Sequence, residues 1–286
     1  MTITITTSNV NGIRAAKRKG IEQWAAKNTP DVWCMQEVRA PQNEIDPIFD
    51  EFGFEYATAG RIADQSGLDR MNEICRIKGR AGVGLLSALP VIDKRYGLPG
   101  LAEDVDSGRW IEADVKTPQG YTVTVVCVYV HAGNTDDPEK MKQKYRFLDT
   151  MLVRMGQLRD EAAHGGKQAV LCGDFNIAHT PLDIKNAKAN EKHAGFLPEE
   201  RAYVDKWLDE YEFVDVMRSL AGDIQGPYTW WSQRGRAFDN NVGWRIDYQF
   251  ATPELAETAR GFVIDKAPTY ELRWSDHAPP TITYDV

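Results

Sequence analysis

The sequence predicts an α/β protein in which two mixed β-sheets pack face to face and helices flank them, a four-layer α/β sandwich. Runs rich in β-branched residues alternate with helical segments along the chain. Some of these runs alternate polar with apolar residues and others are apolar throughout, which is typical of mixed sheets. No low-complexity tract or long linker interrupts the 286 residues. We therefore expect a single domain spanning residues 1–286.

The predicted strands are recognisable by their β-branched and apolar residues, bounded by turn-forming ones. In chain order they are TITITTS, DVWCMQEV, GVGLLSA, YTVTVVCVYV, QAVLCGDF, WRIDYQFA and PPTITYDV.

The clearest helix is predicted over residues 137–163. Asp136 or Asp137 can cap it, Pro138 suits a first turn, and Gly165 and Gly166 end it. An apolar stripe at helical spacing faces the sheet. It consists of Met141, Tyr145, Leu148, Leu152, Met155, Leu158 and Ala162. This leaves Lys140, Lys142, Lys144 and Arg146 for the more solvated faces.

The polar, basic segment 61–81 interrupts two strand-like stretches. We expect a surface excursion, helical in part, that either contacts DNA or only decorates the surface.

Composition restricts the class of protein. Hydrophobic residues make up 42% and charged residues 27%, which is ordinary for a soluble globular protein. No apolar run approaches the ~20 residues needed to cross a bilayer, and the N-terminus lacks the order of a signal peptide. We expect a cytoplasmic protein that is monomeric and does not bind membranes. The formal net charge of -8 argues against a protein that grips nucleic acid by bulk electrostatics.

Four cysteines are scattered without any C-x-x-C pair: Cys34, Cys75, Cys127 and Cys172. Three of them lie in strongly apolar runs. They are expected to be buried free thiols in a reducing compartment, in preference to disulfides or zinc ligands.

The stretch VLCGDFNIAH, residues 170–179, ends an apolar run with Gly173, Asp174 and Asn176. All three are turn formers, so an ordinary turn after a strand is one explanation. The period of an extended chain, however, points Asp174 and Asn176 to the same side. Two oxygen-bearing groups would then face one target.

Five further stretches place polar groups at or near the ends of apolar strands, and each alone has a structural explanation. They are SNVNG with Asn9 and Asn11, CMQEV with Glu37, VYVHAGN with Tyr129, WRIDY with Asp247, and WSDHAPP with Asp276 and His277. Gathered at one edge of a sheet, they would form a carboxylate cluster with few matching cations. Such a cluster requires a metal ion or raised pKa values.

The ligand types identify the metal. Glu37, Asp174 and Asp276 offer carboxylate oxygens, while Asn9, Asn11 and Asn176 offer amide oxygens. The histidines lack zinc-binding spacing, so we predict Mg²⁺, with Mn²⁺ as a plausible substitute. Because Mg²⁺ readily shares its coordination with phosphate, the set fits phosphoester cleavage.

That reaction assigns a role to each group. Asp174 is the candidate base that activates water, and Asn176 donates to the transition state. Asp247 would hold the His277 ring in one tautomer and favour its cationic form, so that the ring binds phosphate. Glu37 leads the metal shell. Tyr129 and Asn9 supply further polar contacts.

Nucleotide-binding motifs are not supported. GRAGVG at 79–84 has Rossmann-like glycines, but Pro90 argues against the long helix that should follow, and no P-loop occurs.

The ordered motifs S-N-V-N-G, Q-E, Y-V, G-D-F-N, G-W-R-I-D-Y and S-D-H-A-P, spread over residues 5–284, resemble the exonuclease III family of abasic-site endonucleases. The resemblance implies a two-sheet α/β fold with the site at one end. It also implies a DNA-repair hydrolase that cuts 5′ to abasic sites and often removes 3′ blocking groups or nucleotides. By motif match, Glu37 is the chief metal ligand, Asp174 transfers the proton and Asn176 is the transition-state amide. Asp247 and His277 resemble the family's coupled pair, and Tyr129, Asn9 and Asp276 fall on its remaining active-site positions.

The resemblance also implies residues that contact the substrate. Trp230 and Trp244 fall where the family shapes a pocket for a flipped, base-less sugar, and core packing is expected for either Trp230 or Trp231. Asn190 and His193 fall where backbone contacts are expected. The remaining substrate-binding candidates are Ile246, His131, Asn134 and Arg14.

Three departures from the family pattern leave alternatives open. The loop YVHAGN lacks the usual proline and amide, so His131 and Asn134 either take over a phosphate contact or do not. Asn11 stands where some relatives carry an aspartate, which would weaken a second metal site. The segment 61–81 is longer than in compact relatives.

The expected partner is duplex DNA with abasic sites or blocked 3′ ends. The competing hypotheses are a related enzyme acting on RNA, phospholipid or inositol phosphate, and a DNA-binding protein without activity.

Overall fold

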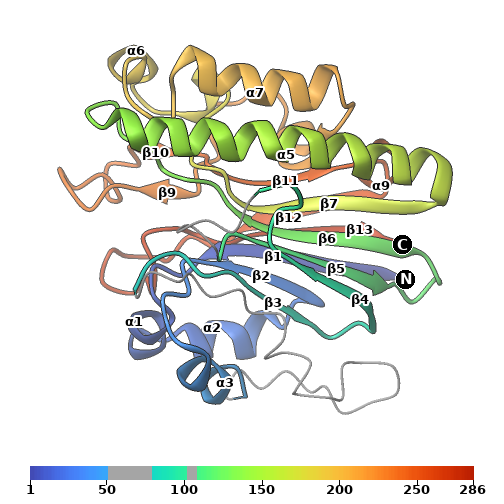
Figure 1. Ribbon diagram of the computed structural model, residues 1–286. Coiled ribbons are helices and arrows are strands. Elements are labelled where there is room, and N and C mark those ends of the chain that lie inside the picture. Colours follow the sequence, from blue (N-terminus) through green and yellow to red (C-terminus); the bar gives the residue numbers. More distant parts are fainter. Residues whose placement is uncertain (51–78, 102–107) are drawn as a thin grey trace.

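The computed structural model describes residues 1–50, 79–101 and 108–286. Within these ranges two mixed β-sheets pack face to face, with α1, α2 and α3 on the outer side of one sheet and α5 and α7 on the outer side of the other (Figure 1). The predicted α/β sandwich is confirmed. No helix in the described part of the chain has the length and apolar character needed to cross a membrane.

The first sheet has the order β12-β13-β1-β2-β3, in which β1 and β2 are parallel and the other neighbours antiparallel. Its strands are β1 (Thr2–Asn9), β2 (Val32–Gln36), β3 (Gly84–Ser87), β12 (Ala259–Ile264) and β13 (Pro280–Asp285). The helices on its outer side are α1 (Ile13–Arg18), α2 (Ile21–Asn28) and α3 (Gln42–Asp50).

The second sheet has the order β4-β5-β6-β7-β11-β8, with β6 and β7 parallel. Its strands are β4 (Val91–Tyr96), β5 (Trp110–Lys116), β6 (Thr122–Tyr129), β7 (Lys167–Asp174), β8 (Val214–Asp215) and β11 (Asp247–Ala251). Two helices cover it, α5 (Pro138–Gly165) and α7 (Pro198–Asp209). The other elements are the 3₁₀-helix η1 (Pro181–Asp183), α6 (Ala187–Asn190), α8 (Val216–Ala221), α9 (Pro253–Ala256) and the ribbon of β9 (Trp230–Trp231) with β10 (Gly243–Trp244).

The apolar strands explain why the sheets pack. Ile3 and Ile5 of β1 and Val125 and Val170 of the second sheet are fully buried in one cluster that contains residues of both sheets. Burial contributes roughly 25 cal/mol per Å² of apolar surface, and this drives the sheets together. Each of the seven predicted runs contains a strand.

Strand β5 was not predicted because its sequence, WIEADVK, places two acidic residues in a short run. Both are nevertheless buried, since each has cationic partners. Arg154 of α5 contacts Glu112 at 2.7 Å, and Lys167 contacts Asp114 at 2.8 Å. Buried charges become tolerable when they are paired in this way. Strands β4 and β12 also escaped prediction, and each lies at the edge of its sheet.

Helix α5 closely matches its prediction, with Asp137 as its N-cap and Gly166 as its C-cap in the left-handed region. The expectation that Lys144 faces solvent is wrong, because this side chain is completely buried. Glu200 on α7 supplies a buried partner, which a pattern read from one helix does not reveal.

The thiol predictions are confirmed for Cys34, Cys127 and Cys172, which are buried and free. Cys75 and most of the segment 61–81 lie outside the described residues.

Candidate active site

Strand ends bring the candidate residues to one end of the sandwich. Asn9 ends β1, Tyr129 ends β6, Asp174 ends β7 and Asp247 begins β11. The sheet register places Tyr129, Asp174 and Asp247 in one row, because Asp174 pairs with both neighbours. The polar groups at the strand ends predicted this convergence.

The backbone near these ends is unusual. Asn11, Glu37, Arg39 and Asn176 all have positive φ, at 46°, 53°, 54° and 50° respectively. Asparagine tolerates this region, but glutamate and arginine rarely adopt it. Strained conformations of this kind cluster at functional sites, where the surrounding structure holds them.

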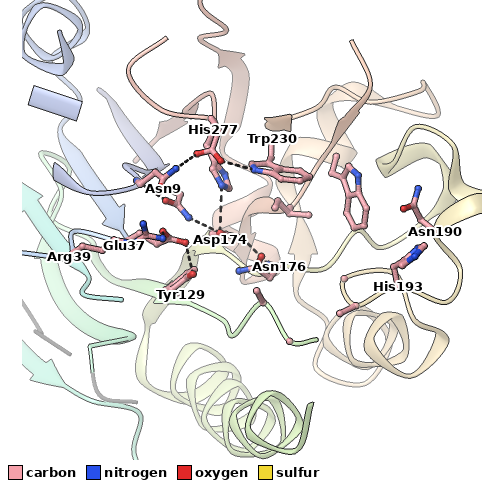
Figure 2. A pocket seen from close by; sticks show the side chains of 18 residues that line it. Asn9, Glu37, Arg39, Tyr129, Asp174, Asn176, Asn190, His193, Trp230 and His277 are labelled. Carbon is pink, nitrogen blue, oxygen red and sulfur yellow. Dashed lines mark hydrogen bonds and ion pairs between the residues drawn. The ribbon is translucent and has the colours of Figure 1, made fainter. Parts of the chain in front are cut away.

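A pocket of about 520 Å³ lies at this end of the sandwich (Figure 2). Its lining includes most of the sequence-predicted residues. These are Asn9, Asn11, Glu37, Tyr129, Asp174, Asn176, Asn190, His193, Trp230, Trp244, Ile246, Asp276 and His277. Arg39, Ala132, Gly133, Ala194 and Gly195 complete the lining.

Asp174 lies at the centre of the polar contacts and is 1% exposed. Its Oδ2 accepts a hydrogen bond of 2.9 Å from the Asn9 side chain, and its Oδ1 accepts one of 2.9 Å from the backbone N–H of Asn176. The Asn176 side chain is held in turn by donating to the carbonyl of Val130 at 2.9 Å. Burial raises the pKa of Asp174 to about 7, against the opposing effect of the His277 charge. A carboxylate with this pKa is suited to accept a proton near neutral pH.

Asp247 lies behind the pocket lining and pairs with His277, which lines the pocket. The Asp247 carboxylate is fully buried and lies 2.9 Å from Nδ1 of His277. The other ring nitrogen, Nε2, lies 3.9 Å from Asp174 Oδ2. Burial alone would lower the pKa of His277, but the Asp247 carboxylate raises it to about 10. His277 is therefore a cation that points its Nε2–H toward the pocket.

Glu37 projects into the pocket between two partners. The Tyr129 hydroxyl donates to Glu37 Oε1 at 2.5 Å, and the Arg39 guanidinium forms an ion pair with the same carboxylate (Figure 2). Burial and then the charges of Glu37 and Asp174 raise the pKa of Tyr129 well above its usual value, so its phenol keeps its proton. Sequence reasoning missed Arg39, although it lies only two residues beyond Glu37.

Asp276 faces the pocket from the loop before β13. It accepts hydrogen bonds from the Asn11 side chain at 2.8 Å and from the indole of Trp230 at 3.2 Å. Burial would raise its pKa, but the His277 charge and these hydrogen bonds lower it, so Asp276 is a carboxylate.

The donor set indicates which residues fit a metal ion. Among the described residues, Asp174, Asp247 and His277 have ligand atoms within 4.8 Å of one another. However, His277 is cationic and its Nδ1 is hydrogen-bonded to Asp247. A protonated ring has no free lone pair for a metal, so His277 is better suited to donate a hydrogen bond than to bind a metal. Glu37, Asn11 and Asp276 instead present hard oxygens to the open pocket, and these are the donors that Mg²⁺ prefers.

Two tryptophans form the apolar wall. The rings of Trp230 and Trp244 meet edge to face with centroids 5.9 Å apart, and Ile246 lies beside them. Trp231 is buried in a separate core cluster, so core packing holds for Trp231 and Trp230 lines the pocket. Asn190 and His193 lie at the far end of the pocket from Glu37 (Figure 2).

Three predicted substrate contacts lie elsewhere. His131 and Asn134 line a neighbouring hollow of about 400 Å³ together with Arg39, Arg80, Arg109 and Lys140. The His131 ring is buried 5.6 Å from that of Phe147. Arg14 is exposed on α1 and pairs with Glu44 at 2.9 Å, outside the pocket.

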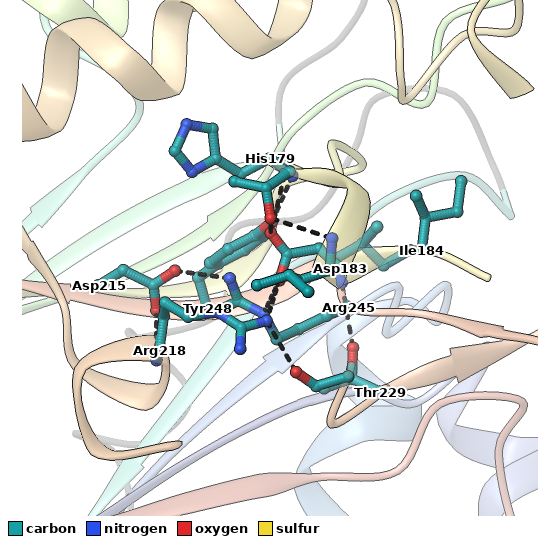
Figure 3. A network of polar contacts seen from close by, with 12 residues as sticks. His179, Asp183, Ile184, Asp215, Arg218, Thr229, Arg245 and Tyr248 are labelled. Atoms are coloured by element: carbon teal, nitrogen blue, oxygen red, sulfur yellow. Dashed lines mark hydrogen bonds and ion pairs between the residues drawn. The ribbon is translucent and has the colours of Figure 1, made fainter. Parts of the chain in front are cut away.

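A buried charge network joins Arg245 to Asp183 and Asp215 (Figure 3). Arg245, between Trp244 and Ile246, is fully buried and contacts Asp183 and Asp215, both at 2.7 Å. Arg218 also contacts Asp183 at 2.5 Å, and the Arg245 guanidinium stacks on Tyr248 at 4.4 Å. The network fixes the turn at η1 and the start of α8 against the pocket wall.

Arg245→Met should destabilise the protein by about 3–5 kcal/mol, because it leaves two buried carboxylates with one cation fewer. Chemical denaturation measures this loss. Arg260→Met is the control, since Arg260 is exposed and lies 3.5 Å from Asp285, and it should cost at most about 1 kcal/mol. Equal midpoints for Arg245→Met and the unmodified protein would contradict this account of the network.

The fold and the site together define a class of protein: α/β-sandwich phosphoesterases with an acid–amide–histidine cluster at one end of the sheets.

Comparison with known proteins supports this class. The profile of the Endonuclease/Exonuclease/phosphatase family matches residues 6–277. An exodeoxyribonuclease of Bacillus subtilis (strain 168) is 29% identical over 279 residues, covering 97% of this chain and 98% of that protein. A DNA-(apurinic or apyrimidinic site) endonuclease of Dictyostelium discoideum is 30% identical, covering 97% of this chain and 69% of that protein.

Solved structures show the same likeness. An AP endonuclease from Archaeoglobus fulgidus superimposes with a TM-score of 0.79 at 28% identity, covering 99% of this chain and 100% of that one. The chain belongs to the endonuclease/exonuclease/phosphatase family, in its exonuclease III branch.

Proposed function

We propose that this protein is a Mg²⁺-dependent endonuclease that cuts duplex DNA on the 5′ side of abasic sites, with 3′-5′ exonuclease or 3′-phosphodiesterase activity. The observation that carries the proposal is one pocket whose lining combines Asp174, Asn176 and His277 with Trp230 and Trp244. The activities named for the relatives support it.

The metal would be held by Glu37, with Asp276, Asn11, Asn9, Asp174 and Asn176 as the remaining oxygen donors in reach. When bound, Mg²⁺ supplies positive charge to phosphate oxygens and lowers the pKa of water, and Mn²⁺ can substitute for it. The carboxylates that line the pocket outnumber the cationic side chains that line it, and this excess of negative charge supports the assignment.

The chain's own residues divide the reaction among them. Asp174 takes a proton from the attacking water, and the water oxygen bonds to phosphorus as the P–O3′ bond breaks. The departing O3′ takes up a proton from solvent. The His277 Nε2–H and the Asn176 amide bind phosphate oxygens whose charge grows in the transition state. The neutral Tyr129 phenol donates to Glu37 and so orients that carboxylate in the pocket. The products are a 3′ hydroxyl and a 5′ phosphate on the base-less sugar.

The pH profile of kcat/KM should be bell-shaped. Asp174 must be deprotonated to act as a base, so the rate should rise as pH passes about 7. His277 must stay protonated, so the rate should fall as pH passes about 10. Asp247→Asn removes the main charge that raises the His277 pKa, and it should move the alkaline limb to lower pH. If the alkaline limb does not move in Asp247→Asn, deprotonation of His277 does not cause that limb.

The tryptophan wall supports the choice of substrate. A sugar without a base fits an apolar slot too narrow for a normal nucleotide, and flipping such a sugar costs less because nothing is unstacked. Asn190 and His193 extend the pocket toward the flanking backbone. The neighbouring hollow, with His131, Asn134 and several basic residues, offers a second region for DNA phosphates despite the net charge of -8.

Trp230→Ala should reduce the preference for an abasic duplex over an undamaged 3′ end by roughly tenfold, because truncating an aromatic side chain of the pocket wall costs about 1–3 kcal/mol of selective contact. Measuring kcat/KM on both substrates gives the ratio. Trp230→Phe keeps a ring and should retain most of the preference. If the preference is unchanged in Trp230→Ala, residues other than Trp230 select the base-less sugar.

A substrate panel tests the proposed function. Labelled duplexes with one tetrahydrofuran site or a 3′ phosphoglycolate are compared with RNA, inositol phosphates and phospholipids, in Mg²⁺ or EDTA. We expect cleavage only of DNA, only with metal, and 5′ to the tetrahydrofuran. Intact abasic duplex at stoichiometric enzyme with Mg²⁺, or faster turnover of a non-DNA phosphoester, contradicts the proposal.

We further infer that residues 1–286 act as one catalytic domain and as a monomer, since one chain supplies every candidate residue of the pocket. The free thiols Cys34, Cys127 and Cys172 support a reducing, cytoplasmic location. Light scattering after gel filtration tests the monomer.

A further inference from the structure

Lys144 and Glu200 form a buried ion pair behind the pocket that the proposed chemistry does not use. Lys144 lies on α5 and Glu200 in the first turn of α7, and both are completely buried. Lys144 Nζ lies 2.5 Å from Glu200 Oε1. Neither residue lines the pocket, so neither can contact the substrate.

The lysine also holds two strand-end loops of the pocket. Its ammonium donates to the carbonyl of Asn176 at 2.9 Å and to that of Ala132 at 3.2 Å. Together with the ion pair to Glu200, three oxygen atoms surround the ammonium. Asn176 has positive φ, so its side chain reaches the phosphate only while its backbone is held in this conformation.

The glutamate holds the opposite wall. Its Oε2 accepts hydrogen bonds from the backbone N–H of Gly195 at 2.6 Å and of Leu197 at 3.0 Å. Gly195 separates Trp244 from Asn176. A methyl group added at Gly195 would lie 3.0 Å from the Trp244 ring and 3.1 Å from the Asn176 carbonyl oxygen.

Stability alone does not account for this pair. A buried ion pair loses the solvation of both charges, and well-packed apolar residues of similar volume are often equally stable. The pair does connect three loops of one pocket through four backbone contacts. Holding a site to a fraction of an ångström requires such supporting contacts.

We propose that Lys144 and Glu200 are positioning residues, which set the distance between Asn176 and Trp244 and thereby the fit of the base-less sugar against the reacting phosphate. This inference rests on the proposed function. It predicts that breaking the pair lowers kcat on abasic duplex and the preference for that substrate, while affinity for duplex DNA is preserved.

The test compares Lys144→Met with Arg154→Met. Arg154 lies on the same helix and forms a buried ion pair with Glu112 at 2.7 Å, but it lies outside the pocket lining. Both variants break a buried pair and should lose similar stability. At a temperature where each is folded by circular dichroism, kcat and KM are measured on a tetrahydrofuran duplex and on an undamaged recessed 3′ end.

We expect Lys144→Met to lower kcat on the abasic duplex at least about tenfold, as for a misplaced transition-state donor, with KM within about threefold. Its abasic preference should also fall, whereas Arg154→Met keeps both values. Lys144→Arg should recover part of kcat. Should Lys144→Met fail to fold, the double variant Lys144→Gln with Glu200→Gln, which buries no lone charge, replaces it with the same expectation.

Equal kcat and equal preference in the Lys144 and Arg154 variants would overturn the proposal. That result differs from a failure of the proposed function, in which the unmodified protein itself leaves the abasic duplex intact.

Discussion

Asp174→Asn is expected to lower cleavage of an abasic duplex by about 10²–10⁴-fold, the range for loss of a general base. The substitution keeps the shape of the side chain but removes its capacity to accept a proton at neutral pH. Because the residue acts on the water and not on the DNA, duplex affinity should stay within about threefold. Single-turnover cleavage and fluorescence anisotropy measure the two quantities separately.

Asp174 is buried and hydrogen-bonded, so a loss of stability must be separated from the loss of the base. The carboxylate accepts hydrogen bonds at both oxygens, from Asn9 and from the backbone of Asn176, whereas an amide has only one accepting oxygen. Asp174→Asn should therefore also cost about 1–3 kcal/mol of stability. Asn9→Ala removes one of the same hydrogen bonds but keeps the base, so it should retain far more activity. Similar losses of cleavage and binding in Asp174→Asn would contradict its role as a base.

Glu37→Gln is expected to raise the Mg²⁺ concentration for half-maximal cleavage at least about tenfold, because a neutral amide replaces the leading anionic ligand. Saturating metal should restore part of the rate. A metal titration at fixed substrate gives both values. Glu22→Gln is a matched control, since Glu22 pairs with Lys17 at 3.4 Å and lies outside the pocket. A titration midpoint unchanged in Glu37→Gln would remove Glu37 from the metal shell.

The sequence was most informative where apolar strands end in polar residues. Asp174 ends, and Asn176 follows, a strand whose central residues 169–172 are apolar, and the end of this strand lies at the same edge of the sheet as the end of its parallel neighbour β6. Asp247 is a polar residue at the start of an apolar strand, and because β11 runs antiparallel to β7 it reaches the same edge of the sheet. Local patterns of this kind are preserved on folding, so both the fold class and the cluster were predictable.

Contacts between distant segments were not predictable. Lys144 looked like one of several solvated lysines. Its burial is explained by its contacts with Glu200, 56 residues away, and with the carbonyls of Ala132 and Asn176. Arg39 was missed because the positive φ of Glu37 and Arg39 breaks the alternation of the strand. His131 lies in the neighbouring hollow because its ring packs against Phe147 of α5.

The central claim is that one phosphate is held between His277, Asn176 and an oxygen-bound metal while a base-less sugar lies against Trp230 and Trp244. A crystal structure of Asp174→Asn with a tetrahydrofuran duplex and Mn²⁺ tests it most directly. We predict an anomalous peak beside Glu37, the scissile phosphate within hydrogen-bond distance of His277 Nε2, and the flipped sugar against the two indoles. Metal bound away from Glu37, or the abasic sugar outside this pocket, would contradict the account.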